Sequence, residues 1–266
     1  MNDLARSFQE HGFVFPIRAF SQGKAGAYLA AYAEHEKSGA IADDLPGFKH
    51  HSIFPWVHEL CTNAAILDAV EALIGPNILL FGCRPWNKHA HDERFISWHQ
   101  DSAYFGLDPH DEVTAWVAIT DSTTENGCLR FIPGSHRWAD QVHREAKDPM
   151  NRLSRGQTIE SIVEDDAVDA ELAAGEFSIH HERTVHGSKG NASGERRLGF
   201  SCFFIPTHVT STLGRRSALL VRGVDTYGHW DTDPVPRFDL DPVGIEASTR
   251  ASARYLTNAT QSAERT

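Results

Sequence analysis

RFISWHQDSAYFGLDPHDEVTAWVAIT, residues 94–120, contains two short apolar runs separated by a linker rich in Gly, Pro and Asp. Runs of this length and composition, bounded by turn residues, are typical of strands. Further runs of the same kind occur from residue 77 onward: NILLFGC, CLRFIP, EFSIHH and RLGFSCFFI. The turns between them include PGS and NASG. The succession predicts a β-sandwich or barrel.

The segment before residue 77 is predicted to be helical. Ser21 can cap a helix that runs through Lys37, and Asn63 can cap a second helix, AAILDAVEALI, which Gly75 closes. Helices in front of strands predict an α+β fold. We expect a double-stranded β-helix, that is a cupin-like jelly roll, with helices packed on one face.

The chain of 266 residues is predicted to form a single domain, residues 1–266, because no repeat or Pro/Gly/Ser linker divides it. No apolar run approaches the roughly 20 residues that cross a bilayer. The N-terminal MNDLARSFQEHGF lacks the pattern of a signal peptide. These features predict a cytoplasmic protein without a membrane partner.

The formal net charge of −11 argues against a nucleic-acid partner, which usually meets a basic surface. We expect a small-molecule substrate instead, and the sequence leaves a homo-oligomer possible. The four cysteines are far apart and form no CxxC pair, so neither a zinc ribbon nor a disulfide framework is indicated. Cys128 and Cys202 lie in apolar runs and are predicted to be buried free thiols.

Residues 139–170 are rich in Asp, Glu, Arg and Gln and predict a long insertion. Long irregular segments in compact domains are usually functional, which favours a lid. A disordered excursion on the surface is an equally good interpretation of the same composition.

The segment SWHQDS, residues 97–102, carries a candidate metal site. In a strand, His99 and Asp101 project from one face. His186, far along the chain, can complete a set of two histidines and one carboxylate. That set leaves three coordination positions open and is associated with non-haem Fe(II) oxygenases. A 2-oxo acid can fill two of these positions and O2 the third.

The context of His186 strengthens this prediction. His186 is followed by Ser188, a turn and then Arg197 at the start of an apolar run. A hairpin here would bring Arg197 beside the histidine. An arginine fork binds a carboxylate through two hydrogen bonds, as the distal carboxylate of 2-oxoglutarate requires. Ser188 could donate a second hydrogen bond, and a surface salt bridge is the alternative fate of Arg197.

Two stretches resemble the phytanoyl-CoA dioxygenase family of Fe(II)/2-oxoglutarate oxygenases. They are WHQDSAYFGLDPHDEVTAWVAITDSTTENGCLRFIPGSHR at 98–137 and HHERTVHGSKGNASGERRLGFSCFFIPT at 180–207. The motifs WHQD, TAW, ENG, PGSH and the late His, Ser and Arg occur in the family's order. The resemblance covers most of residues 77–207 and, more weakly, 217–230, and the bacterial small-metabolite branch of the family is the nearest in character.

The resemblance implies a role for each matching residue. The implied ligands of Fe(II) are His99, Asp101 and His186, and the implied co-substrate residues are Arg197, Ser188, Trp116 and Lys88. His136, His143, His180 and His181 are expected to be structural or to lie near the site without binding the metal. Related halogenases carry a small residue in place of Asp101, so the carboxylate here favours hydroxylation over halogenation.

The substrate is the least specified part of the prediction. Tyr104 and Arg84 could line the pocket, and Arg222 and Tyr227, near the C-terminus, could close over it. No basic patch with a glycine-rich loop is present to hold the phosphates of an acyl-CoA. We therefore expect a small polar or anionic metabolite, such as an amino-acid-like or phosphonate-like compound or a natural-product intermediate. The coproducts would be succinate and CO2.

Two other functions use the same fold. A cupin-like isomerase or hydrolase could use Zn or Mn at the same three ligands, but it would have no need of Arg197. A non-catalytic binding protein would turn over no 2-oxoglutarate at all.

Overall fold

Two β-sheets face each other in the computed structural model, which describes residues 3–39, 48–145, 148–153 and 155–263. The large sheet has the order β1-β10-β5-β12-β2-β14-β15 and the small sheet the order β3-β11-β6-β9. The strands of the large sheet are β1 (Phe13–Arg18), β10 (Glu176–His181), β5 (Val113–Ala118), β12 (Arg197–Pro206), β2 (Ile78–Lys88), β14 (Ser217–Arg222) and β15 (Asp231–Thr232). Those of the small sheet are β3 (Ile96–His99), β11 (His186–Ser188), β6 (Leu129–Phe131) and β9 (Val168–Ala170).

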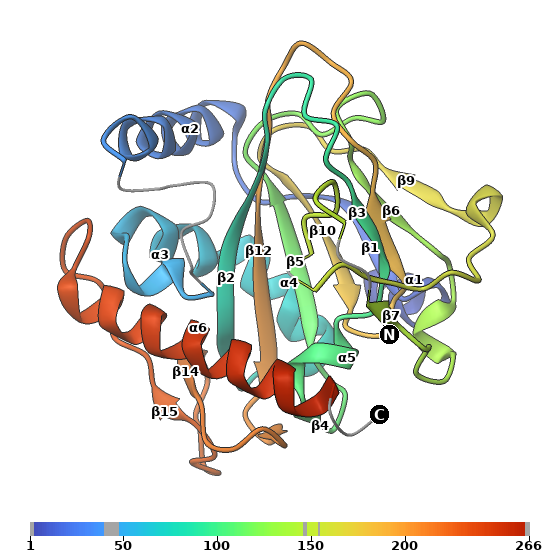
Figure 1. Ribbon diagram of the computed structural model, residues 1–266. Helices are drawn as coiled ribbons and strands as arrows, with labels where there is room; N and C mark the ends of the chain where they lie inside the picture. The colour runs from blue at the N-terminus through green and yellow to red at the C-terminus, as the bar shows by residue number, and fades with distance from the viewer. Residues whose placement is uncertain (1–2, 40–47, 146–147, 154, 264–266) are drawn as a thin grey trace.

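All strand pairs within these sheets are antiparallel except β14 with β15. Figure 1 shows the small sheet lying against one half of the large sheet. Apolar side chains fill the closed end between them, where Phe13 of β1 stacks on Phe131 of β6 with ring centroids 4.7 Å apart. The predicted jelly-roll fold is confirmed, and the prediction of a single domain stays a prediction.

Helices cover the outer face of the large sheet (Figure 1). They are α2 (Gln22–Lys37), α3 (Pro55–Cys61) and α4 (Ala64–Ile74), and their buried side chains share one core with β2, β5 and β12. Both predicted caps are present: Ser21 Oγ accepts from the amide of Lys24, and Asn63 Oδ1 accepts from the amide of Ala65. The remaining helices are α1 (Asp3–His11), α5 (Ser102–Phe105), α6 (Pro242–Ala263) and the short 3-10 turns η1 (His50–Ser52), η2 (Ser135–Arg137) and η3 (Glu164–Asp166).

Some elements differ from the expectation. Strand β1 lies in the segment predicted to be helical and forms the edge of the large sheet beside β10. The polar C-terminal segment forms α6, in whose first half Ala247 and Ser248 are buried. Among the described residues, no helix is both long and apolar enough to cross a membrane.

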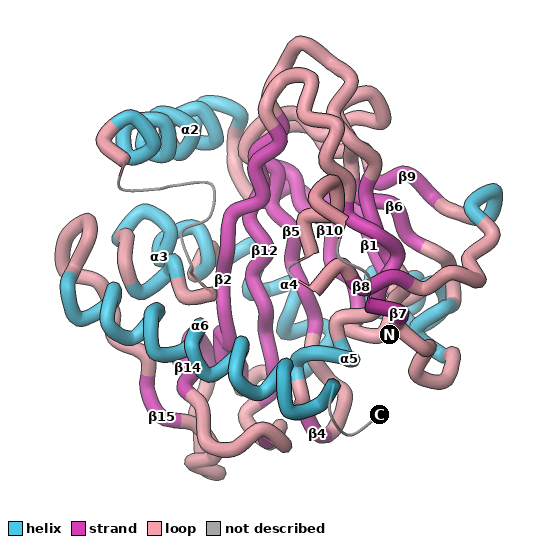
Figure 2. The backbone as a smooth tube through the Cα atoms, viewed as in Figure 1, coloured by secondary structure: helices cyan, strands magenta, loops and turns pink. Residues whose placement is uncertain are grey.

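The insertion at 139–170 docks along the edge of β3. The amide of Arg152 donates to the carbonyl of Phe95 (2.9 Å), and the amide of Ile159 donates to that of Trp98 (2.8 Å). The segment also contains the short strands β7 (Arg144–Glu145) and β8 (Gln157–Thr158), and it ends in β9. Figure 2 shows it as a long loop crossing the small sheet, with short strands inside it. The described residues of the insertion are therefore ordered against β3, and its role as a lid stays a prediction.

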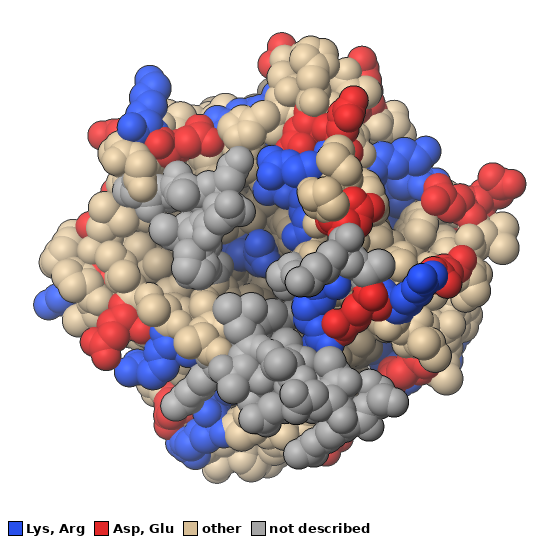
Figure 3. Space-filling view, viewed as in Figure 1, with Lys and Arg blue, Asp and Glu red and all other residues tan. Residues whose placement is uncertain are grey.

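The face in Figure 3 carries acidic and basic side chains interspersed with one another.

The four cysteines are buried free thiols, as predicted for Cys128 and Cys202. The last short strands, β4 (Leu107–Asp108) and β13 (Thr210–Ser211), pair with each other beside α5.

Candidate metal centre

Strand pairing brings the two candidate histidine ligands together. His186 on β11 is the register partner of His99 on β3, although the two are far apart in the sequence. Their ring centroids are 4.1 Å apart and both side chains are buried. The small sheet therefore positions two imidazoles side by side, facing the large sheet.

Asp101 joins them from the start of α5. Strand β3 ends at His99, and Asp101 has helical backbone angles, so the predicted strand alternation does not extend to it. Its Oδ1 nevertheless lies 3.6 Å from His99 Nε2. Gln100 points away, and its side-chain amide donates to the carbonyl of Arg183 (2.8 Å). The chain turn after β3 thus brings about the convergence that the sequence predicted.

Hydrogen bonds fix the orientation of both rings. His99 Nδ1 donates to the Ser97 carbonyl (2.9 Å), and His186 Nδ1 donates to the Thr184 carbonyl (3.0 Å). Each ring then presents the lone pair of Nε2, the usual arrangement around a metal-binding histidine. The candidate ligand atoms of His99, Asp101 and His186 all lie within 4.8 Å of one another. The donor set and its tautomers fit a divalent cation.

The electrostatics also fit a cation. Burial alone would raise the pKa of Asp101, but the nearby imidazoles of His180, His99 and His186 hold it well below its usual range. Burial, together with the neighbouring His99 and His180, lowers the pKa of His186. A carboxylate that stays ionised beside an imidazole that stays neutral is the state that a metal ion requires.

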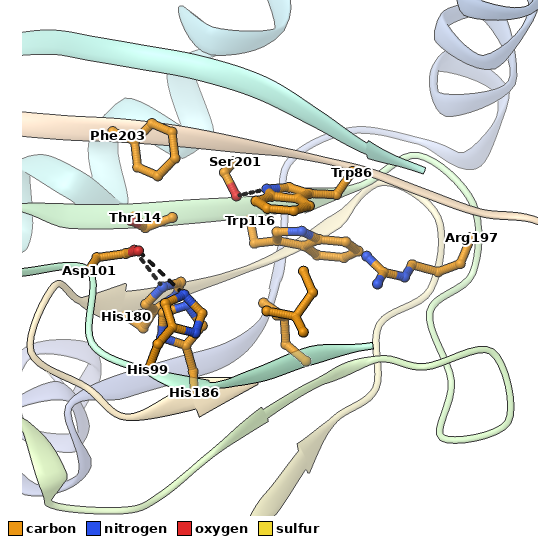
Figure 4. Close-up of a pocket in the computed structure, with 12 residues that line it drawn as sticks. Trp86, His99, Asp101, Thr114, Trp116, His180, His186, Arg197, Ser201 and Phe203 are labelled. Atoms are coloured by element: carbon orange, nitrogen blue, oxygen red, sulfur yellow. Dashed lines mark hydrogen bonds and ion pairs between the residues drawn. The ribbon is translucent and has the colours of Figure 1, made fainter. Parts of the chain in front are cut away.

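A third histidine, His180, borders this group and was not predicted as part of it. It lies on β10 of the large sheet, and its Nε2 is 3.9 Å from Asp101 Oδ2. Its ring centroid is 4.5 Å from that of His186. Neither ring nitrogen has a hydrogen-bond partner among the described residues. Figure 4 shows His99, His180 and His186 gathered below Asp101.

Two buried basic residues lie on neighbouring strands of the large sheet. Arg197 and Lys88 are register partners on β12 and β2, and each is 1% exposed. Lys88 donates to Ser188 Oγ (2.8 Å) and to the Lys189 carbonyl, whereas Nε and Nη2 of Arg197 have no hydrogen-bond partner in the described part of the chain. The guanidinium carbon of Arg197 lies 5.0 Å from the centre of the Trp116 ring (Figure 4).

Neither cation pairs with a carboxylate among the described residues. Burial and the neighbouring Arg152 lower the pKa of Arg197 to about 9. Burial, then Arg197 and Arg152, lower the pKa of Lys88 to about 6. A buried guanidinium without an anion is unfavourable, and a carboxylate ligand would remove that cost.

A cavity joins the candidate metal ligands to Arg197. Both sheets line it, with Trp86, Thr114, Trp116, His180, Arg197, Ser201 and Phe203 from the large sheet, and Ile96, His99, Leu129 and His186 from the small sheet, together with Asp101. Trp86 Nε1 donates to Ser201 Oγ (3.0 Å), which holds one indole against the wall. The described cavity therefore runs from the candidate metal ligands to Arg197.

The hairpin predicted around Arg197 does not form. Strand β11 belongs to the small sheet and β12 to the large sheet, so the turn between them crosses from one sheet to the other. Arg197 pairs with Lys88 rather than with His186, and it reaches the cavity from the opposite wall. A jelly roll alternates between its sheets, which a local sequence pattern cannot reveal.

Arg222 and Tyr227 do not line the described cavity, so their role as substrate residues stays a prediction without support from the cavity. Arg222 forms ion pairs with Asp68 (2.8 Å) and Glu71 (2.7 Å) on α4, on the helical side of the sheet. Tyr227 is 56% exposed, within a turn where the Asp225 carboxylate accepts from its amide (2.9 Å). The Tyr227 ring lies beside those of His208 (6.3 Å) and His229 (5.5 Å).

Tyr104 and Arg84 lie closer to the cavity without lining it. Tyr104 on α5 has its ring 5.5 Å from that of His143 and 5.3 Å from the guanidinium of Arg155, both from the 139–170 insertion. The Arg84 guanidinium stacks over Trp86 at 4.2 Å, and the side chain is exposed. They are candidates for the rim of the cavity.

His136 and His181 lie away from the candidate ligands, whereas His143 lies next to the segment that carries them. His136 Nε2 faces the Gln9 carbonyl (3.2 Å), and the His181 ring packs against Phe8 at 6.3 Å. His143 Nε2 accepts from the amide of Gln100 (2.9 Å) and so ties the insertion to the metal-binding segment.

Two buried carboxyl groups lie behind the cavity wall. Thr114 Oγ1 donates to Glu112 Oε1 (2.8 Å), and Glu182 Oε1 lies 3.3 Å from His110 Nδ1. Burial, then the charge of Glu182, raises the pKa of Glu112. Burial raises the pKa of Glu182 to about 8.

This chain is similar in sequence to proteins named as dioxygenases. It is 29% identical to a probable alpha-ketoglutarate-dependent hypophosphite dioxygenase of Stutzerimonas stutzeri, over 55% of this chain and 52% of that protein. It is 32% identical to peroxisomal phytanoyl-CoA dioxygenase of Homo sapiens, over 54% and 44%. The chain thus spans about half the length of these curated relatives.

Solved structures resemble the chain over more of its length. A structure described as a non-heme monooxygenase, ThoJ apo, has a TM-score of 0.87 and 33% identity, and the match covers 99% of this chain and 100% of that one. CytC3 with Fe(II) and alpha-ketoglutarate shares the fold, with a TM-score of 0.65 and 23% identity, over 86% and 91%. The family description Phytanoyl-CoA dioxygenase (PhyH) matches residues 8–199. With this match over more than half of its length, the chain belongs to the phytanoyl-CoA dioxygenase family.

Proposed function

We propose that this protein is an Fe(II)- and 2-oxoglutarate-dependent oxygenase that hydroxylates a small organic molecule and releases succinate and CO2. The observation that carries the proposal is the pairing of two features in one cavity. Three oriented donors, from His99, Asp101 and His186, converge at one end, and the buried guanidinium of Arg197 lies unpaired at the other. A keto dicarboxylic acid is the class of molecule that fits both.

The roles of the residues follow from their positions. His99, Asp101 and His186 hold Fe(II) and leave three coordination positions open. Bound Fe(II), together with 2-oxoglutarate and O2, supplies the oxidising chemistry that hydroxylates a C–H bond. Asp101 supplies the carboxylate ligand, so no position is vacated for a halide, which favours hydroxylation.

At the far end, Arg197 binds the distal carboxylate of 2-oxoglutarate through its planar fork. Lys88 contributes a second donor there, and Ser188, already bonded to Lys88, orients it. The ring of Trp116 forms the wall on which the carbon chain of the co-substrate lies. These residues exclude water from the co-substrate, because each of them is buried.

The substrate enters on the side of Phe203, away from Arg197. Phe203 belongs to an aromatic cluster whose other members are Phe48, Phe81, Phe105, Tyr104 and Trp230. Phe48 stacks on Phe203 at 4.9 Å. This wall suits the apolar part of a substrate, and Arg84 and Tyr104 at the rim suit a polar or anionic group of a small metabolite.

Anaerobic titration with Fe(II) and 2-oxoglutarate tests the proposal. We expect a weak visible absorption band that requires both components, and succinate formation once O2 is admitted. Asp101→Ala should abolish both. Asp111→Ala is the matched control, because that carboxylate pairs with His208 outside the cavity and its loss should change neither.

The competing functions give different results. A hydrolase or isomerase on the same ligands would bind the metal and yet show no band with 2-oxoglutarate. A non-catalytic binding protein would release no succinate with any candidate substrate. Succinate formation that persists in Asp101→Ala would overturn the proposed metal centre.

A further inference from the structure

His180 is a buried polar side chain that the proposed reaction does not yet use. It is 2% exposed, and its ring packs between Phe131, at 5.1 Å, and His186, at 4.5 Å. Both ring nitrogens lack a hydrogen-bond partner in the described part of the chain. An unpaired buried imidazole is costly, so its place beside Asp101 calls for an explanation.

The two oxygens of Asp101 face different histidines. Oδ1 lies 3.6 Å from His99 Nε2, and Oδ2 lies 3.9 Å from His180 Nε2. The second distance is about 1 Å longer than a hydrogen bond, so a small rotation of the carboxylate would close it. The carboxylate is therefore flanked on one side by a candidate ligand and on the other by His180 (Figure 4).

The coordination mode of this carboxylate matters to the proposed reaction. Two histidines and a carboxylate leave three positions open only if the carboxylate uses one oxygen. A carboxylate that binds through both oxygens would occupy one of the positions needed by 2-oxoglutarate or O2. A donor on the second oxygen prevents this, and partners of that kind orient metal ligands in many sites.

We propose that His180 is a positioning residue, which donates a hydrogen bond from Nε2 to Asp101 Oδ2 and keeps Asp101 bound to the metal through Oδ1 alone. This inference rests on the proposed metal centre and goes beyond it by assigning a third histidine. A fourth ligand is the competing role. The distances favour positioning, because the group of donor atoms within 4.8 Å of one another contains His99, Asp101 and His186 without His180.

Two substitutions separate the hydrogen bond from the bulk of the ring. His180→Leu removes the donor and keeps an apolar side chain, whereas His180→Gln keeps an N–H donor. We expect His180→Leu to weaken Co(II) affinity about 10- to 100-fold, the usual effect of losing such a partner. His180→Gln should restore most of that affinity. His181→Leu is the matched control, since the neighbouring ring packs on Phe8 and its loss should not change Co(II) binding.

A spectroscopic measurement decides between the two roles. Pulsed EPR of the Cu(II)-loaded protein should count two coordinated imidazoles in the wild type and two in His180→Gln. Three imidazoles in the wild type would overturn the proposal, and so would equal Co(II) affinity in the wild type and in a folded His180→Leu. A wild type that binds no metal would defeat the proposed function instead, so the two failures are distinguishable.

Discussion

Arg197 and Lys88 face each other as register partners on neighbouring strands, both buried and neither paired with a carboxylate among the described residues. Burial is the main cause of the lowered pKa of each, and the charge of Arg197 lowers the pKa of Lys88 further. A carboxylate bound beside this pair would stabilise the charged form of both side chains. The predictions below begin with this pair.

Replacing Arg197 by Met should raise the KM for 2-oxoglutarate about 30- to 150-fold, the ratio for roughly 2–3 kcal/mol lost with a charged hydrogen bond. 2-Oxo acids without the distal carboxylate should be affected much less. Arg196→Met is the control, because Arg196 pairs with Glu36 (2.9 Å) on the outside of the sheet. An equal rise in KM for 2-oxoglutarate and for 2-oxo acids without the distal carboxylate would contradict the role assigned to Arg197.

Co-substrate binding should take up a proton at Lys88. Its pKa of about 6 leaves the amine mostly neutral at about pH 8, and a bound carboxylate favours the ammonium form. The affinity for 2-oxoglutarate should therefore weaken as the pH rises above 6, by up to about tenfold per unit. Calorimetry of the Fe(II) protein in buffers of different ionisation enthalpy measures the uptake, which Lys88→Met should remove. A flat pH profile in the wild type would refute this prediction.

Gly199→Ala should disturb the co-substrate wall. A Cβ at this position would overlap the ring of Trp116, which packs directly against the glycine. The ring must then shift toward the cavity, so we expect a higher KM for 2-oxoglutarate and a loss of about 1–3 kcal/mol in the free energy of unfolding. Thermal unfolding and steady-state kinetics measure both. Gly194→Ala, where a Cβ meets nothing within 4 Å, should be neutral in each assay.

Glu112→Gln should stabilise the protein at alkaline pH. The folded pKa of Glu112 is raised, so between its ordinary pKa and that raised value the folded state holds more protons than the unfolded state. The free energy of unfolding of the wild type therefore falls as the pH rises through this window. The melting temperature of the variant should be higher by a few degrees at about pH 8 and nearly equal at about pH 4.

The exposed Glu125 offers the matched substitution, Glu125→Gln, which should leave the pH profile of the melting temperature unchanged. If the Glu112→Gln variant melts at a lower temperature than the wild type at about pH 8, ionisation of the Glu112 carboxyl group does not destabilise the folded protein as predicted.

Much of the fold was predictable because it depends on local patterns. The apolar runs at β5 and β12 are bounded by turn residues, and the caps Ser21 and Asn63 act within a few residues of their helices. The candidate ligands His99 and Asp101 are close in the sequence, so any turn of the chain keeps them near each other. An imidazole and a carboxylate at these two positions were then enough to predict a metal site.

What could not be predicted depends on contacts between distant segments. Nothing in the sequence around Arg197 reveals that β11 and β12 lie in different sheets. The ion pairs of Arg222 could not be predicted either, because its partners Asp68 and Glu71 lie about 150 positions earlier in the chain. His180 resembles any strand histidine until β10 is placed opposite β11, and only then does it meet Asp101.

All ten residues of β12 are buried, and they alternate between two environments. Leu198, Phe200, Cys202 and Phe204 pack under the helices, while Arg197, Ser201 and Phe203 line the cavity. One face of β12 thus packs against the helices and the other lines the cavity. A substitution made to stabilise the packing under the helices would therefore also shift the side chains that line the cavity. Adaptation to new substrates is therefore easier at the rim, where Arg84 on β2 and Tyr104 on α5 lie, than along this strand.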